Sequence, residues 1–418
     1  MPSIEKILKL QLVMILCFTM PNPMMDIFMP SLHTITTLIL YATILYTAAY
    51  MMSNQKQYNK IYILYVIYFL IYSIVIYLDL TTGRKYPLDE MLGCPKSIGA
   101  FISTTLIILF FILQAPLYQK VKDFSFLVKW YTILNLPLVI FYIRTVGVAE
   151  IQFDESITDI STLSLSSAAS NCLLLALIFK NSFSKSRSIN NIILFIVFAS
   201  TMYVWGNLAK RGAILWFFVT LVVYFILKSK NIKNTIIKCT ILLGVIYLML
   251  PMLISVIENL SPFLAERLEM TLIEGNTSGR MDEEGAYVLA VNQFNNSPFF
   301  GSYFRIVTTI PLWQGMYPHN IILELLITFG IAGLIPFIYF LGKMLSILRK
   351  SFSSDKTGIV SIEKVLGIMF LNIFFSMMTT GTILLSLPFW VNIAILLTIN
   401  NNKQNVKLFN YNTTQKQS

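Results

Sequence analysis

One histidine and three arginines are the residues of this chain best suited to chemistry. His319 is one of only two histidines, and it lies in Pro318-His319-Asn320, where the polar stretch 258–317 gives way to an apolar run. Arg267, Arg280 and Arg305 belong to that polar stretch. Histidine exchanges protons near neutral pH, and arginine presents a planar fork of donors to anionic oxygens. The residue types and their placement at a membrane surface predict chemistry on an anionic substrate.

A fourth arginine, Arg211, stands in Lys210-Arg211-Gly212-Ala213 between two apolar runs with almost no loop. Inserting a charged side chain into the membrane interior costs roughly 2.5–3.5 kcal/mol. The presence of Arg211 between two apolar runs therefore needs an explanation. Two interpretations fit. Arg211 is either an interfacial side chain that extends from a helix end to the headgroups, or a guanidinium that clamps phosphate.

Arg280 precedes a short helical pattern. Apolar residues between Gly285 and Phe294 recur at approximately helical spacing, and Ser297-Pro298 stops the pattern. Arg280 would then stand near the start of an amphipathic helix, and helix N-termini attract anions. The alternative is an ion pair between Arg280 and one of three nearby acids, which are Asp282, Glu283 and Glu284.

His319 and Asn320 open the next apolar run, where they are either site residues or interfacial polar residues, with Asn320 capping the helix. Glu324 follows Asn320 by one helical turn on the same face. A carboxylate inside a membrane segment is a functional candidate by default. His33 is isolated at the end of another apolar run, and we expect it to be structural.

The elements that position these residues are membrane helices. The chain is 56% hydrophobic and 12% charged, with a mean hydropathy of +0.70. Its apolar runs have the length of spanning helices and lack the alternation of a barrel. The sequence predicts an all-α polytopic membrane protein with twelve transmembrane helices and one large extracytoplasmic loop. The predicted spans are 7–27, 34–52, 61–79, 98–117, 127–144, 162–179, 190–208, 212–227, 236–257, 318–341, 365–379 and 382–399.

The basic residues orient these helices. With the N-terminus inside, 22 of the 31 lysines and arginines fall in cytoplasmic segments. This bias predicts cytoplasmic termini, helices 1–9 over 1–257, the outer loop over 258–317, helices 10–12 over 318–399, and a disordered cytoplasmic tail over 400–418. The net charge of +11 is then an orientation signal rather than a sign of nucleic-acid binding.

The sequence lacks the common motifs for binding nucleotides and metal ions. The sequence has no phosphate-binding P-loop, no dinucleotide glycine pattern, no HExxH and no DxD pair on an outer loop. The four cysteines are scattered without metal-ligand spacing. Nucleotide-dependent and metal-dependent reactions are therefore disfavoured.

Three separated patterns together resemble the superfamily of O-antigen polymerases and O-antigen ligases. They are Arg211-Gly212-Ala213, then Gly279-Arg280 followed by Ser297-Pro298-Phe299-Phe300-Gly301, then Pro318-His319-Asn320-Ile321-Ile322-Leu323-Glu324 continuing to Phe329-Gly330. The sequence departs from the family pattern in three ways. Lys210 stands where serine is common, no tryptophan follows Arg280, and Tyr303 replaces a second glycine after Gly301. These departures affect the assignment to a subfamily more than the resemblance itself.

The resemblance implies a membrane glycosyltransferase of the GT-C type in the bacterial plasma membrane, with an undecaprenyl-diphosphate-linked oligosaccharide as donor and no metal or other cofactor. Arg211 and Arg280 would stabilise the leaving diphosphate, and His319 would accept the proton of the attacking hydroxyl. The expected substrate-binding residues are Asn320, Glu324, Arg305 and Arg267.

The resemblance leaves two kinds of acceptor for the transferred glycan possible. A polymerase joins lipid-linked repeat units into O-antigen or capsular polysaccharide, whereas a ligase transfers finished polymer to a lipid A core or a protein. Expected partners are membrane lipids, lipid-linked donor and acceptor, a chain-length regulator and a flippase. A twelve-span transporter or flippase is the alternative from another class. Such a transporter would consist of two related halves of six helices each. The sequence shows no internal repeat, and the 258–317 loop interrupts a division into two such halves, so both observations argue against a transporter.

Overall fold

The computed structural model describes most of the chain, namely residues 3–17, 30–53, 59–82, 97–121, 123–146, 162–208, 211–248, 254–255, 258–259, 262–272, 280–282, 284–310, 313–353, 360–379 and 386–399. Within these ranges every regular element is a helix and no strand occurs. The predicted tail 400–418 and residues 273–279 of the outer stretch lie outside the described residues.

Where the structure describes the predicted spans, each contains a helix. These helices are α1 (Ile4–Leu12) continuing as the π-helix η1 (Val13–Cys17), α3 (Pro30–Ser53), α4 (Lys60–Thr82), α5 (Ile98–Gln114) with the 3-10 helix η2 (Ala115–Lys120), α6 (Ser125–Val146), α8 (Thr162–Ile178), α9 (Arg187–Leu208), α10 (Arg211–Lys228), α11 (Ile232–Leu248), α15 (Ile321–Ser353), α16 (Ile362–Ser376) and α17 (Leu387–Ile399).

Six of the described helices are long and apolar enough to cross a membrane, namely α3, α4, α5 with η2, α6, α9 and α15. Shorter apolar helices lie within α8, α10 and α17. The expectation of an all-α membrane protein agrees with these helices, whereas the number of twelve spans stays a prediction.

Large apolar side chains cover the outside of the molecule. On α9, Phe195 is 70% exposed and Ile192 is 59% exposed. Polar side chains instead meet inside: the amide of Asn372 on α16 donates to Asn171 on α8 (3.0 Å), and Asn171 donates to the hydroxyl of Tyr131 on α6 (3.3 Å). This arrangement is the one a bilayer favours, because the hydrocarbon accepts apolar surface and leaves buried polar groups to pair with one another.

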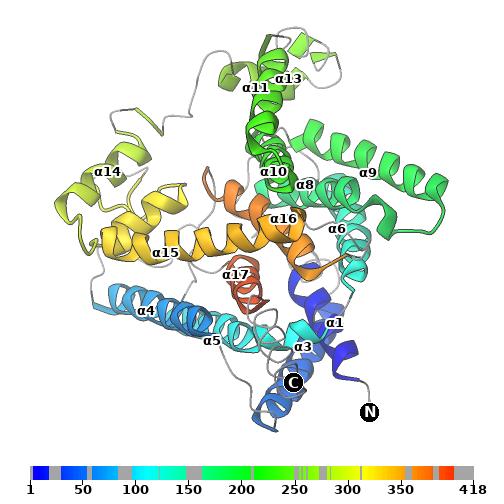
Figure 1. Cartoon of the computed structure of the whole chain (residues 1–418). Coiled ribbons are helices and arrows are strands. Elements are labelled where there is room, and N and C mark those ends of the chain that lie inside the picture. The colour runs from blue at the N-terminus through cyan, green and yellow to red at the C-terminus, as the bar shows by residue number, and fades with distance from the viewer. Residues whose placement is uncertain are drawn as a thin grey trace, which may run out of the picture.

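The interior is centred on α17, which lies between α15 on one side and α4 and α5 on the other (Figure 1). Trp390 of α17 is fully buried, and its ring contacts Phe69 and Tyr72 of α4 at centroid distances of 5.0 and 4.9 Å. The hydroxyl of Tyr65 donates to the backbone carbonyl of Trp390 (2.8 Å). These contacts fix α4 against α17.

Two helices occupy the stretch predicted to be the outer loop. α13 (Pro262–Leu272) packs against α9 and α10, and α14 (Ala286–Asn296) packs against α15. In Figure 1, α14 lies beside the first part of α15. The helix predicted from the spacing between Gly285 and Phe294 is confirmed, and it ends before Ser297 as expected.

α15 begins at Ile321, runs well past the predicted end of its span, and is broken at Gly330. Gly330 has a φ of 62° and a ψ of −157°, a conformation that only glycine adopts readily. The chain around Pro298 and Gly301 lies against this break. α15 therefore consists of two helical parts joined where the outer segment meets it.

Candidate functional site

The first turn of α15 is capped by Asn320. The side-chain oxygen of Asn320 accepts from the backbone amides of Ile322 (2.9 Å) and Leu323 (3.2 Å), as an N-cap residue does. Its side-chain amide donates to the carbonyl of Met378 (3.1 Å), and the amide of Ile321 donates to the carbonyl of Met377 (3.1 Å). Capping, one of the two roles considered for Asn320, is thus observed, and the cap ties α15 to the end of α16.

His319 has a strained backbone directly before this cap. Its φ of 53° is the only positive φ of a non-glycine residue among those described, and such a conformation costs on the order of 1–3 kcal/mol. The imidazole packs on Tyr317 at a centroid distance of 4.3 Å and lies 6.4 Å from the ring of Trp313. Its Nδ1 is buried and makes no hydrogen bond within the described residues. The ring is therefore held by aromatic contacts, with one nitrogen unused.

The surroundings of His319 disfavour its charged form. Burial lowers the pKa of His319 from 6.5 to about 3, with further lowering from the positive charges of Arg280 and Arg305. Protonating the imidazole requires removing it from water and placing a third positive charge beside two others. His319 is accordingly neutral at pH 7, which is the state in which an imidazole accepts a proton.

A charge-removal experiment tests this electrostatic coupling. We expect Arg280→Gln to raise the pKa of His319, because removing one neighbouring cation makes the imidazolium less unfavourable. The pKa is measured by NMR titration of the protein labelled in histidine, with His33→Gln to assign the second of the two histidines. Arg349→Gln, at an exposed position in the last part of α15, is the control and leaves the pKa unchanged. An unaltered pKa in Arg280→Gln would show that the two groups are not coupled.

Arg305, whose charge acts on His319, forms a buried ion pair with Glu324. The Nη1 of Arg305 lies 4.0 Å from Oε1 of Glu324, and their side chains are 0% and 3% exposed. The guanidinium also lies over the rings of Phe304 (4.6 Å) and Tyr317 (5.4 Å). The ring of Tyr317 therefore contacts both Arg305 and His319. Arg305 and Glu324 were both predicted to bind substrate, and the structure shows them paired with each other.

Gln293 of α14 holds the backbone that carries Arg305. The side-chain amide of Gln293 donates to the carbonyls of Tyr303 (3.2 Å) and Arg305 (3.0 Å), and its side-chain oxygen accepts from the amide of Val307 (2.8 Å). Asp79, near the end of α4, accepts from the amide of Phe304 (3.2 Å). α14 and α4 thus both position Arg305, although neither polar residue was singled out from the sequence.

The buried pair makes a sharp prediction for stability. Replacing one partner of a buried ion pair costs about 3–5 kcal/mol, whereas replacing both with apolar residues is often close to neutral. We therefore expect Glu324→Leu to destabilise the protein strongly and Arg305→Met with Glu324→Leu to recover much of the loss, both read from thermal unfolding in detergent micelles. The control is the partly exposed pair Lys9–Glu5, at 3.0 Å, where Glu5→Ala costs about 0–1 kcal/mol. Equal losses in the single and double variants would contradict the pairing.

Arg280 is partly exposed at the edge of this cluster. Its carbonyl accepts from the amide of Tyr287 (3.0 Å), which fixes it to the first turn of α14. Burial raises the pKa of the Tyr287 hydroxyl, and the charge of Arg280 opposes that rise. No ion pair joins Arg280 to Asp282 or Glu284 in the structure, and Glu283 lies outside the described residues, so the structural alternative for Arg280 stays open. An accessible guanidinium near His319 is in position to meet an anion.

The start of α10 contacts Thr379, which lies close to the start of α15. The indole nitrogen of Trp216 donates to the hydroxyl of Thr379 (2.7 Å), and the Trp216 ring stacks on Phe375 at 5.8 Å. Thr379 directly follows Met378, whose carbonyl accepts from Asn320. The chain position of Arg211, the first residue of α10, is therefore brought near the start of α15. The side chains of Arg211 and of Arg267, which lies in α13, are outside the described residues.

The structure thus gathers the ends of four elements, α14, α15, α16 and α10, around one histidine and two arginines. Within the described residues no group of three His, Cys, Asp or Glu side chains could hold a metal ion; because several acids of the outer stretch lie outside them, metal independence stays a prediction. The described helices are those of an all-α membrane protein, and a cationic cluster that contains His319 lies near the ends of these helices.

Comparisons of the chain with family profiles, curated proteins and solved structures find no match. The resemblance to the O-antigen polymerase and ligase superfamily therefore rests on the three sequence patterns alone.

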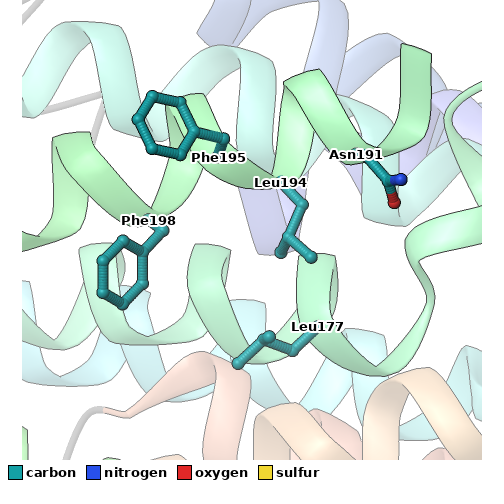
Figure 2. A pocket seen from close by; sticks show the side chains of 5 residues that line it. All are labelled: Leu177, Asn191, Leu194, Phe195 and Phe198. Atoms are coloured by element: carbon teal, nitrogen blue, oxygen red, sulfur yellow. The ribbon is translucent and has the colours of Figure 1, made fainter. Parts of the chain in front are cut away.

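A cavity of about 330 Å³ lies elsewhere, between α8 and α9 (Figure 2). Leu177 of α8 and four residues of α9 line it, namely Asn191, Leu194, Phe195 and Phe198. It is open, its lining is apolar apart from the Asn191 side chain, and it shares no residue with the cluster around His319.

Proposed function

We propose that the protein polymerises undecaprenyl-diphosphate-linked oligosaccharide repeat units into a surface polysaccharide, such as O-antigen or capsule, on the outer face of a bacterial plasma membrane. The observation that carries the proposal is the neutral imidazole of His319 beside Arg280 and Arg305. A proton acceptor next to cations suits a reaction in which a hydroxyl loses a proton while a diphosphate gains charge.

In the proposed reaction a hydroxyl of the acceptor sugar attacks the anomeric carbon of the donor. The new carbon–oxygen bond forms as the bond from that carbon to the diphosphate oxygen breaks, and the bonding electrons leave with the lipid diphosphate. The hydroxyl proton passes to the imidazole of His319. Direct displacement inverts the anomeric centre, and Arg280, with Arg211, neutralises the charge that develops on the phosphate oxygens.

Donor binding also changes the basicity of His319. Burial, and then the charges of Arg280 and Arg305, keep the pKa of His319 at about 3. A bound diphosphate offsets the positive charges but not the burial, so it relieves part of this lowering and makes the imidazole a stronger base. Proton acceptance is thereby linked to donor binding. Arg305, which is buried against Glu324, acts as a positioning residue.

Reconstitution tests the function directly. The purified protein is incorporated into liposomes with a synthetic undecaprenyl-diphosphate oligosaccharide and EDTA, and lipid-linked products are separated by size. We expect a ladder of repeat units. A ligase would give no ladder and would instead transfer the glycan to an added lipid A core, and a flippase would move the substrate between leaflets without joining it. Either of those results would replace the proposed activity.

The proposed site must also face the exterior. Of the 31 basic residues, 22 fall in segments predicted to be cytoplasmic, and Met281, next to Arg280, is 62% exposed. In a variant without native cysteines, we expect Met281→Cys to react with a membrane-impermeant maleimide in cells whose outer barrier has been opened. Lys350→Cys, at the far end of α15, should react only after the plasma membrane is permeabilised. The reverse pattern would place the site in the cytoplasm and remove the proposed donor.

A further inference from the structure

Residues 297–302 are hydrogen-bonded into the break in α15. The amides of Ile331 and Ala332 donate to the carbonyls of Pro298 (2.9 Å) and Phe299 (3.0 Å), and the amide of Ser302 donates to the carbonyl of Ile327 (2.7 Å). In an uninterrupted helix the amide of Ile331 would pair with that same carbonyl of Ile327. The break at Gly330 removes the helical hydrogen bond between the Ile331 amide and the Ile327 carbonyl. The segment supplies a new partner for each of these two groups.

Two glycines permit this close contact. A Cβ on Gly330 would lie 2.5 Å from the carbonyl carbon of Phe299, and a Cβ on Gly301 would lie 2.4 Å from that of Thr328. Both glycines have positive φ. The two backbones touch without intervening side chains, which is the condition for irregular backbone to keep its polar groups satisfied away from water.

The contact places the segment beside the interior of α15 rather than beside its first turn. Gly330 lies along the apolar helix α15, one of the six helices able to cross a membrane, and at 1.5 Å per residue it is roughly 14 Å from the helix start at Ile321. No charged residue occurs between Phe294 and Phe304. The segment therefore carries no charge that would oppose its contact with hydrocarbon.

The side chains at the tip of the segment point outward. Phe299 is 68% exposed and Phe300 is 80% exposed, and along the adjoining part of α15 Ile335 is 62% exposed and Ile338 is 52% exposed. These exposed apolar side chains lie on one helix and on the segment docked to it. Beside a helix able to cross a membrane, lipid hydrocarbon is the medium that suits such side chains.

We propose that residues 297–302 form a re-entrant segment that inserts Phe299 and Phe300 into the bilayer hydrocarbon. Because α14 ends directly before this segment, the insertion anchors α14, and with it Arg280, at the membrane surface. The proposal requires only that α15 is a membrane span. It therefore stands or fails independently of the proposed polymerase activity.

Spin-label accessibility tests the insertion. Phe300→Cys is labelled with a nitroxide in the cysteine-free protein in liposomes, and collisions with oxygen and with a water-soluble nickel chelate are measured. Ile335→Cys on α15 serves as the hydrocarbon reference and Met281→Cys as the aqueous reference. We expect the oxygen-to-nickel ratio at position 300 to match that at 335 and to exceed that at 281 several-fold. A ratio at 300 equal to that at 281 would overturn the proposal.

A second comparison tests whether the glycine contact holds the segment in place. Gly330→Ala puts a Cβ into the backbone of Phe299, whereas a Cβ on Gly342, further along α15, meets nothing within 4 Å. We expect the label at position 300 to shift towards the aqueous ratio in Gly330→Ala and to stay unchanged in Gly342→Ala. Retention of the hydrocarbon ratio in a monodisperse Gly330→Ala protein would show that docking at the break does not determine the insertion.

Discussion

Loss of the His319 imidazole is expected to abolish detectable long-chain polymer while the protein still inserts and folds. A general base contributes about 10²–10⁴-fold to a rate. The variant to use is His319→Asn, because the φ of 53° at this position is tolerated by asparagine better than by most residues. Asparagine keeps the backbone and a polar side chain but cannot accept the proton. Polymer length is measured in cells by gel electrophoresis at matched expression.

The control for this variant is the other histidine of the chain. His33→Asn should leave polymer length unchanged, since His33 is predicted to be structural. In His319→Asn, lipid-linked single repeat units should accumulate on the outer leaflet, whereas a transport defect would leave them on the cytoplasmic one. Wild-type chain lengths in His319→Asn would mean that the proton goes elsewhere. Glu324 or Glu283 would then become the leading candidate for its acceptor.

Replacing Arg280 by lysine is expected to leave polymerisation severely impaired although the charge is kept. Lysine lacks the planar fork that binds two phosphate oxygens at once. Losing charge-assisted hydrogen bonds of about 1.5–3 kcal/mol each lowers the rate by one to two orders of magnitude. Arg280 is partly exposed and makes no ion pair within the described residues, so its replacement should cost little stability. The rate is measured with reconstituted protein at several donor concentrations.

Arg349→Lys, at an exposed position in the last part of α15, is the matched control and should be active. We expect Arg211→Lys to be impaired in the same way as Arg280→Lys, since both were predicted to contact the diphosphate. Arg280→Lys should also leave the pKa of His319 low, because the positive charge remains, which separates binding geometry from electrostatics. Normal polymer from Arg280→Ala would remove this residue from the mechanism.

The helices themselves could be read from the chain because their signals are local. Apolar runs such as 61–79 and 98–117 coincide with α4 and α5, since twenty or so apolar residues in sequence suffice to specify a spanning helix. α14 was predictable for a similar reason, because its apolar spacing ends at Ser297-Pro298. The cap by Asn320 also follows from residue type and position before a helix. The candidates His319 and Arg280 were found from their chemistry and their location in one polar stretch.

The relations among these residues were decided by the tertiary structure. Glu324 was visible as a carboxylate in an apolar helix that needed a partner, but nothing in the sequence identified Arg305 as that partner. Likewise, the link from Asn320 through Met378 and Thr379 to α10, and the docking of residues 297–302 at Gly330, join segments far apart in the chain. Hydropathy and spacing report on neighbours along the chain, whereas burial, ion pairing and the pKa of His319 depend on which surfaces meet when the helices pack.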